Sequence, residues 1–325
     1  MKTLALFNNK GGVGKTSLAY HLGFMFAELG HRVVFADLDP QANLSSLCLD
    51  EDRLEQLWKL KPRPTIYGAI EKLRRGIGDV ERVAAEAVTG SIVLVPGDLQ
   101  LSELEDDLSQ QWPKCLDRDE RAFRVTTSLY RVVADVGDRH GADIAVLDVG
   151  PNFGAINRAA LIAADYVLVP VAPDLFSMQG LENVGPRLVK WRGEWRDRLD
   201  RAPELDFSLP AGMMASLGYV VARHSVLAGG AVKAFQRWID RMPEVYRRSF
   251  GQPPATDLDI ASDEYCLGQL KDFRSLMPMA QEAKKPMFLL KPADGAIGGH
   301  QGAVRQAYTD FRVLAERIAT AMGGL

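Results

Sequence analysis

Cysteine is scarce in this sequence of 325 residues: Cys48, Cys115 and Cys266 lie far apart and form no CxxC pair. This pattern argues against a disulfide framework and is typical of reduced thiols in a cytosolic protein. The five histidines show no metal-ligand spacing. No run approaches the ~20 apolar residues that a membrane-spanning helix needs, and the apolar run 4–7 is too short for a signal peptide. We therefore expect a cytoplasmic protein.

A large excess of charge is also missing. The chain has 39 Lys and Arg against 42 Asp and Glu, a net charge of -3 at pH 7. Bulk charge therefore does not predict binding to nucleic acid, although a local basic patch stays possible. The hydrophobic fraction of 47% is ordinary for a globular protein. A chain of this length can bury a core without disulfides or metals.

The order of apolar and polar segments is that of an α/β protein. Continuous apolar runs suit strands that are buried on both faces of a parallel sheet. The predicted strands are residues 3–7, 32–37, 92–95, 144–147, 167–171 and 213–221, and the predicted helices are 16–29, 123–136, 155–164, 180–195 and 304–321. We predict a single α/β domain over 1–325, with a mostly parallel twisted sheet and helices on both faces. Less regular insertions are expected near 49–90 and 196–262.

A glycine-rich segment separates the first strand from the first helix. Glycines let successive backbone N–H groups point at phosphate oxygens, and the helix adds the positive end of its dipole. The segment is nearly a P-loop, with Asn9 in place of the first glycine, so Lys15 should reach the β- and γ-phosphates and Thr16 should ligate Mg²⁺. The alternative is a glycine-rich turn with an incidental Lys-Thr pair. The predicted nucleotide-binding residues are Lys10, Gly11, Gly12, Val13, Gly14, Lys15, Thr16 and Ser17.

Lys10 places a second cation beside this loop. The two lysines would repel each other unless a polyphosphate neutralised them. The form KGGxGK[ST] resembles the deviant Walker A motif of the ParA/MinD family of ATPases, with the ParA/Soj-like partition ATPases as the nearest branch. The resemblance implies an ATP-dependent homodimer in which Lys15 serves its own subunit's nucleotide and Lys10 reaches the nucleotide of the other subunit. Otherwise Lys10 is a solvated loop charge.

Aspartates follow two of the predicted strands. Asp37-Leu38-Asp39-Pro40-Gln41 resembles the family's DxDPQ switch I, which implies that Asp39 positions the attacking water and lies near Mg²⁺ without binding it directly. The strand that ends at Asp148 resembles a Walker B strand, which implies that Asp148 holds Mg²⁺, directly or through water. In the alternative interpretation, Asp37 and Asp39 cap the next helix. With Lys10 and Lys15, Asp39 completes the predicted catalytic set.

Gly150 departs from the family pattern, which usually has two prolines after a small residue or Cys at this place in switch II. The sequence here is Val149-Gly150-Pro151. The glycine predicts a more mobile switch II loop. The likeness to the family continues through Asn157 to Pro173, and it is weak over 196–262.

The resemblance implies a partition or positioning ATPase whose ATP-bound dimer binds nucleoid DNA and whose hydrolysis is stimulated by a ParB-like or other activating protein. Lys233, Arg237 and Arg241 recur every fourth residue and would follow one helix face, so they are the candidate DNA contacts. A solvated helix face, or a site for an acidic protein, is the alternative. The alternative function is a regulatory ParA-like ATPase that acts only through protein partners. Membrane binding is not expected, because the segment 319–325 lacks a basic face and bulky anchors.

Overall fold

The computed structural model spans residues 1–325 and describes all of them except 223–235, 255–257 and 274. Within the described residues, eight strands form one sheet in the order β3-β4-β2-β5-β1-β6-β7-β8. The short β3 pairs antiparallel with β4, and all other neighbouring pairs are parallel. The strands are β1 (Lys2–Leu6), β2 (Val33–Asp37), β3 (Glu86–Ala87), β4 (Ile92–Val95), β5 (Ile144–Asp148), β6 (Tyr166–Val171), β7 (Ala215–Ala222) and β8 (Cys266–Leu270).

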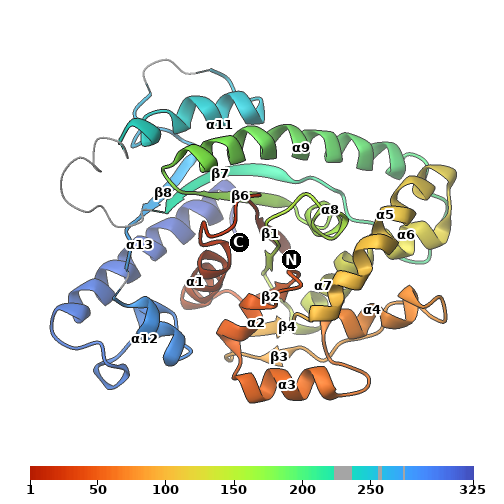
Figure 1. Ribbon diagram of the computed structural model, residues 1–325, viewed down its shortest axis with the longest axis horizontal. Helices are drawn as coiled ribbons and strands as arrows, with labels where there is room; N and C mark the ends of the chain where they lie inside the picture. The colour runs from red at the N-terminus through yellow and green to blue at the C-terminus, as the bar shows by residue number, and fades with distance from the viewer. Residues whose placement is uncertain (223–235, 255–257, 274) are drawn as a thin grey trace.

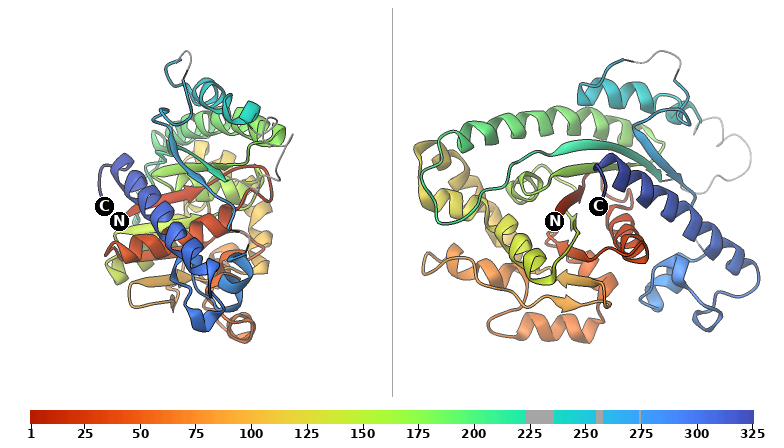
Figure 2. Two further views of the ribbon diagram at one scale, coloured as in Figure 1. Left: turned by 90° about the vertical axis from the view of Figure 1, so that its left-hand side faces the viewer. Right: turned by 180° about the vertical axis from the view of Figure 1, so that it is seen from behind.

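Helices cover both faces of this sheet (Figures 1 and 2), which confirms the predicted α/β fold. One hydrophobic core joins the sheet to α1 (Lys15–Glu28), α2 (Asn43–Cys48), α3 (Glu51–Lys59), α12 (Met277–Glu282) and α13 (Gly299–Ala321). The other core joins it to α4 (Ile66–Arg74), α5 (Leu104–Lys114), α6 (Glu120–Thr126), α7 (Ser128–His140), α8 (Ala155–Ile162), α9 (Leu175–Leu199) and α11 (Met242–Phe250).

The period of two along each strand divides side chains between the two cores. In and just after β1, Leu4 and Leu6 face the α1 and α13 side, whereas Ala5 and Phe7 face the α7 and α8 side, and all four are fully buried. Successive residues of a strand point to opposite faces. A strand buried on both faces therefore reads as a continuous apolar run, which is why these strands could be found from the sequence.

Some predicted elements are divided or extended. The predicted helix 123–136 is two helices, α6 and α7, separated at Thr127. The Thr127 hydroxyl donates to the Phe123 carbonyl oxygen at 2.8 Å, a local bond that competes with helix continuation. The segment 49–90, expected to be less regular, contains α3 and α4, which bury Leu57 and Ile70 completely.

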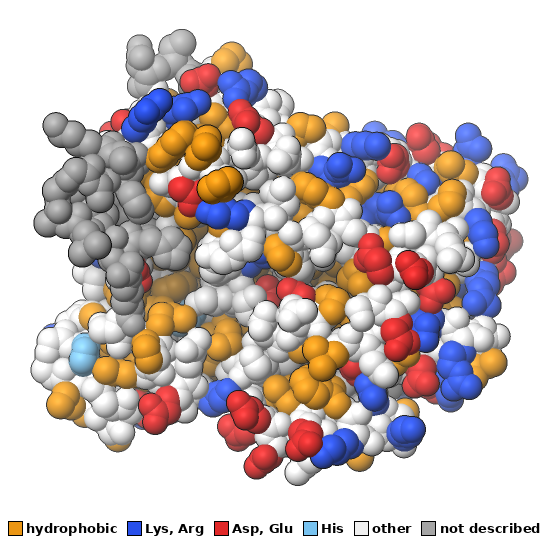
Figure 3. All heavy atoms as spheres, viewed as in Figure 1, with side chains coloured by type: hydrophobic (Ala, Val, Ile, Leu, Met, Phe, Trp, Pro, Cys, Tyr) orange, Lys and Arg blue, Asp and Glu red, His pale blue; other side chains and the backbone are white. Residues whose placement is uncertain are grey.

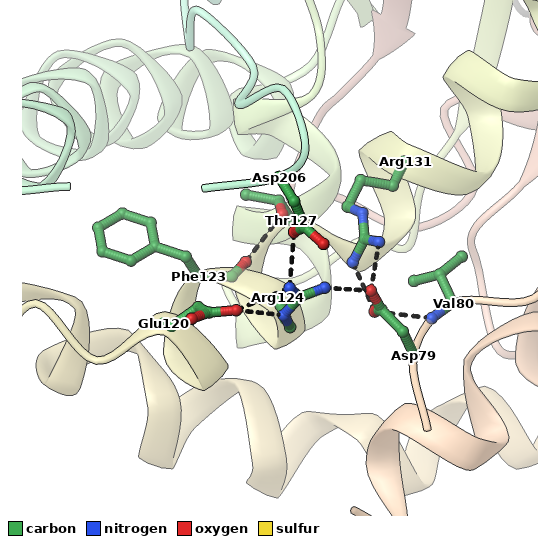
Figure 4. Close-up of polar contacts among 8 residues, drawn as sticks. All are labelled: Asp79, Val80, Glu120, Phe123, Arg124, Thr127, Arg131 and Asp206. Carbon is green, nitrogen blue, oxygen red and sulfur yellow. Dashed lines mark hydrogen bonds and ion pairs between the residues drawn. The ribbon is translucent and has the colours of Figure 1, made fainter. Parts of the chain in front are cut away.

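A cluster of ion pairs ties the two expected insertions to α6 and α7 (Figure 4). Both terminal nitrogens of Arg131 donate to Asp79 at 2.7 Å. Arg124 also binds Asp79, and it donates to Asp206 at 2.6 Å. Asp79 belongs to the segment 49–90 and Asp206 to 196–262, so the two arginines connect segments that are far apart in the sequence.

The two ends of the chain lie side by side (Figures 1 and 2). The Lys2 amine donates to the carbonyl oxygens of Met322 and Gly324. α13 packs against the sheet through Phe311, Leu314 and other buried side chains. In the part of the chain that the structure describes, no helix is long and apolar enough to cross a membrane.

Candidate functional site

The loop between β1 and α1 is shaped to receive an anion. Gly12 and Gly14 adopt left-handed backbone conformations, with φ of 75° and 79°, and no atom lies within 4 Å of where a Cβ would stand. α1 is described in full, and it begins after Gly14 with neither a side-chain cap nor an acidic residue in its first turn. Its first N–H groups and the positive end of its dipole are therefore free to bind phosphate.

Lys15 is the first residue of α1 and lies inside the site. Only 8% of the residue is exposed, and its Nζ donates to the Lys10 carbonyl oxygen at 3.2 Å. Burial lowers the pKa of Lys15, while Asp148 and Asp39 work to raise it. The ammonium group is thus desolvated and lies in the field of two carboxylates, where a phosphate would supply a charge-assisted partner.

Two of these carboxyl groups end neighbouring parallel strands. Asp37 of β2 lies opposite Asp148 of β5 in the sheet register, and both side chains are fully buried. Burial raises the pKa of Asp37 to about 7, although hydrogen bonds from the Ser45 N–H and hydroxyl, each of 2.7 Å, act against the shift. Asp37 therefore binds the first turn of α2, which favours the structural interpretation of this residue.

Asp148 and Thr16 fit the needs of a magnesium ion. Burial, and then Asp37, raise the pKa of Asp148 well above its ordinary value, and the facing Thr16 hydroxyl opposes this shift. Among the described residues, neither carboxyl oxygen of Asp148 has a well-formed hydrogen bond, so a cation would supply a missing partner. No three His, Cys, Asp or Glu side chains of these residues converge on a metal position. Mg²⁺ commonly keeps waters and phosphate oxygens as ligands, so one carboxylate and one hydroxyl suffice.

Asp39 lies two residues beyond β2 and acts electrostatically on Lys15 and Asp148. Its Oδ1 accepts the Gln41 N–H at 3.0 Å, and the residue is 8% exposed. Oδ2 makes no hydrogen bond to any residue that the structure describes, which leaves it for a water molecule. Asp39 closes a local turn and does not cap α2, whose first turn is bound by Asp37.

Lys10 does not point at the bulk solvent. Its Nζ makes a 2.5 Å ion pair with Asp174 and lies 3.4 Å from the Ser177 hydroxyl oxygen. Asp174 caps α9 by accepting the Ser177 N–H at 2.8 Å. Burial works to raise the pKa of Asp174, but the bonds to Lys10 and to the Ser177 N–H outweigh it and lower the pKa. The alternative interpretation of Lys10, a solvated loop charge, does not fit this conformation.

An apolar pocket adjoins the loop. Its volume is about 200 Å³. It is bounded by Val13 and Ser17 near the start of α1 and by Leu270, Phe273 and Met287 from the C-terminal part of the chain. An apolar pocket beside a phosphate site is suited to the base of a nucleotide.

Several contacts around the site were not found from the sequence. Gly150 was expected to loosen switch II, but its N–H and carbonyl groups both bind the Asn157 side chain. Glu105 accepts the first two N–H groups of α8. The capping spacing of Asp174 and Ser177 before a helix was a usable signal. The partners of these side chains lie far away in the sequence, so the contacts themselves were not predictable.

The proposed basic row is interrupted. Lys233 lies outside the described residues. Residues 236–239 are helical, and α11 begins only at Met242, so the turn at 240–241 separates Arg237 from the next helix. The assumption of one continuous helix is therefore wrong here. Arg237 and Arg241 are exposed, and their guanidinium groups flank the Trp238 ring at 5.6 and 5.3 Å from its centroid.

Comparison with known proteins identifies the family. A family model described as an AAA domain matches residues 1–201, more than half of the chain. The chain belongs to this family, within its ParA/MinD group. The chromosome partitioning protein ParA of Caulobacter vibrioides is 28% identical over 200 residues, which cover 62% of this chain and 67% of that protein. The first curated relatives that the chain matches are longer proteins, and the chain spans only 42% of the length of each.

Solved structures share the fold of this ParA/MinD-type chain over nearly its whole length. A protein from Corynebacterium diphtheriae superposes with a TM-score of 0.74 at 22% identity and covers 99% of both chains. A plasmid partition protein from Borrelia burgdorferi, bound to AMPPNP, superposes with a TM-score of 0.62 at 16% identity and covers 98% of both chains. At these identities the likeness establishes the shared fold.

Proposed function

We propose that this chain is a ParA-like ATPase that works as an ATP-dependent dimerisation switch, for DNA partition or for positioning a cargo in the cell. The observation that carries the proposal is the different placement of two lysines on one phosphate loop. Lys15 is buried and faces Asp39 and Asp148, whereas Lys10 lies at the rim of the site, paired with Asp174. One lysine suffices to hold a nucleotide in its own subunit, so the second is available for a partner's nucleotide.

In this proposal ATP binds with its phosphates against the N–H groups of the loop and its base in the apolar pocket beside Val13. Lys15 neutralises the β- and γ-phosphates. Thr16 and Asp148 hold Mg²⁺, which supplies charge neutralisation on the phosphate oxygens when bound. The AMPPNP-bound partition protein of the same fold supports the choice of ATP.

Hydrolysis requires a water molecule aligned with the γ-phosphate. Asp39 is proposed to position this water through Oδ2, because its Oδ1 is engaged by the Gln41 N–H. Pro40 fixes the backbone directly after the carboxylate. Basal turnover should be slow, since a switch must keep its state until an activating protein arrives.

Dimerisation is tested by sedimentation velocity with and without ATP and Mg²⁺. The wild-type protein should be monomeric alone and dimeric with ATP. Lys10→Ala should retain most of its ATP affinity, measured by calorimetry, but stay monomeric. Lys190→Ala is the matched control, because this exposed lysine pairs with Glu194 on α9 away from the loop. Equal losses of affinity and dimerisation in Lys10→Ala would assign Lys10 to its own subunit's nucleotide.

The DNA part of the proposal rests on the Lys and Arg side chains, which a dimer presents twice. A dimer would therefore neutralise more DNA phosphates and release more counterions from the DNA than a monomer. Lys and Arg side chains lie over α9 and α11, with acidic side chains between them (Figure 3). A gel shift on arbitrary duplex DNA with ATP, at low and moderate salt, tests this. Replacing Lys233, Arg237 and Arg241 together by Ala should abolish the shift and spare dimerisation.

We place the protein in the cytoplasm, at the nucleoid when DNA is bound, with a ParB-like or other activator as partner.

One observation favours the second candidate, a regulatory ATPase that acts only through protein partners. Arg248, which extends the basic row, is paired with Glu182 and Glu244, and the row is broken at the turn 240–241. Fewer free cations on one face mean weaker attraction to phosphates. If the ATP-bound dimer never shifts DNA at low salt, this candidate becomes the better description.

A further inference from the structure

Asn157 lies in the first turn of α8 and is bonded to the switch II loop that precedes this helix. It is 2% exposed. Its Oδ1 accepts the Gly150 N–H at 3.1 Å, and its Nδ2 donates to the Gly150 carbonyl oxygen at 2.9 Å. Nδ2 also lies 2.7 Å from the Asn152 carbonyl oxygen. One buried side chain thus holds both backbone polar groups of Gly150.

Gly150 in turn lies against the carboxylate of Asp39. A Cβ built on Gly150 would stand 3.5 Å from Asp39 Oδ1 and 3.5 Å from Asn157 Nδ2. The Asp39 carboxylate and the Asn157 amide therefore both lie beside Gly150. A shift of the loop at Gly150 would remove one wall of the space that the Asp39 carboxylate occupies.

Glu105 of α5 fixes the start of α8 itself. The residue before α8 is Gly154, which has no side chain to cap the helix. The Glu105 carboxylate takes that place, accepting the N–H groups of Ala155 at 2.5 Å and Ile156 at 3.0 Å. A Cβ on Gly154 would stand 2.7 Å from Glu105 Oε1, so a larger residue there would require the carboxylate to shift. A carboxylate at this end of a helix is favoured by the helix dipole.

We infer that Glu105 and Asn157 are positioning residues for ATP hydrolysis. Through α8 they hold Gly150 against Asp39, and we call Glu105, Gly150 and Asn157 the switch II brace. Gly150 by itself would make the loop flexible, but unlike proline it has an N–H, which the Asn157 side chain accepts. The hydrogen bonds from Asn157 therefore restrict the loop. The inference rests on the proposed role of Asp39.

The first experiment is hydrogen–deuterium exchange on Asn157→Ala without nucleotide. Exchange in peptides covering 149–156 should rise at least about tenfold, because the Gly150 N–H and the start of the loop lose their partners. Exchange in α1 and α13 should be unchanged, which excludes a general loss of stability. Unchanged exchange in 149–156 would overturn the brace, whether or not the protein hydrolyses ATP.

The second experiment separates turnover from binding. Asn157→Ala and Glu105→Gln should each lower kcat for ATP about tenfold or more, because a small misplacement of a catalytic group is costly. ATP affinity should stay within about twofold, since neither residue contacts the phosphate loop. Glu103→Gln is the matched control, because Glu103 binds Tyr67 and Arg74 and makes no contact with α8. It should leave kcat unchanged.

The outcomes distinguish the brace from the proposed function. If kcat and ATP affinity fall together in both variants, or if kcat is unchanged in both, the positioning role is overturned. If the wild-type protein binds ATP but shows no turnover even with an activator, the proposed function falls. The exchange measurement then still decides whether Asn157 holds the loop.

Discussion

Replacing Asp174 by Asn should strengthen ATP-dependent dimerisation. In the structure Asp174 holds Lys10 within its own subunit by a 2.5 Å ion pair. If Lys10 serves the partner's nucleotide, this pair must break each time a dimer forms. Asn removes the charge but keeps the cap of α9, because Asn and Asp are equally good at this position. The variant therefore releases Lys10 without unravelling the helix.

The magnitude follows from the exposure of the pair. The side chains of Lys10 and Asp174 are 27% and 40% exposed, so solvent screens much of their attraction, and about 0.5 kcal/mol per pair is reasonable. A dimer must break two such pairs, which gives about 1 kcal/mol, or a dissociation constant about fivefold lower in the variant. The difference should shrink as salt is raised, because screening weakens the pair.

Sedimentation velocity with ATP and Mg²⁺, in an Asp39→Ala background that we expect to prevent turnover, measures the dissociation constant. Asp119→Asn is the control, because Asp119 caps α6 by accepting the Ala122 N–H at 3.2 Å, away from the site. It loses the same helix-dipole interaction and should leave dimerisation unchanged. Unaltered dimerisation of Asp174→Asn would refute the reasoning, and so would weaker dimerisation in a variant whose thermal stability equals that of the wild type, because damage to α9 is then excluded.

Four further outcomes are expected. Lys15→Ala should weaken ATP binding by at least ~2 kcal/mol, because it removes a charge-assisted contact; unchanged affinity by calorimetry would contradict the site. Asp39→Ala should bind ATP but scarcely hydrolyse it, and normal turnover in a phosphate-release assay would reduce Asp39 to a turn residue. Burial raises the pKa of Asp37 to about 7, so binding of ATP with Mg²⁺ at pH 6.5 should release protons, as a nearby cation favours the charged carboxylate. Calorimetry in two buffers of different ionisation enthalpy measures this, and the release from this group should vanish by pH 8.5. Burial lowers the pKa of His21 to about 4, so the folded protein favours the neutral imidazole. The free energy of unfolding is therefore unaffected by this group above pH 6.5, and it falls by about 3 kcal/mol toward pH 4 because the unfolded chain takes up the proton first. The free energies of unfolding of wild type and His21→Gln, from denaturant titrations, should therefore converge as the pH falls from 6.5 to 4. A constant difference between them would contradict a lowered pKa of His21.

The conformation of the glycine-rich loop could be predicted from the sequence because it depends on local order. A strand, a run of glycines and a helix in succession place N–H groups, Lys15 and Thr16 around one point. Asp39 and Asp148 could be predicted to meet because parallel strands bring their C-terminal ends to one edge of a sheet. The strands themselves were visible because burial on both faces leaves a continuous apolar run.

The tertiary structure alone decided what these groups touch. Lys10 and Asp174 are 164 residues apart in the sequence, and only the packing of α9 against β6, the strand next to β1, brings them together. The raised pKa of Asp37 likewise depends on the side chains that exclude water from it. The regular spacing of Arg237 and Arg241 assumed a continuous helix, but the chain turns between them. Sequence spacing sets the possible contacts within one element, whereas contacts between elements, and the water they exclude, exist only once the chain has packed.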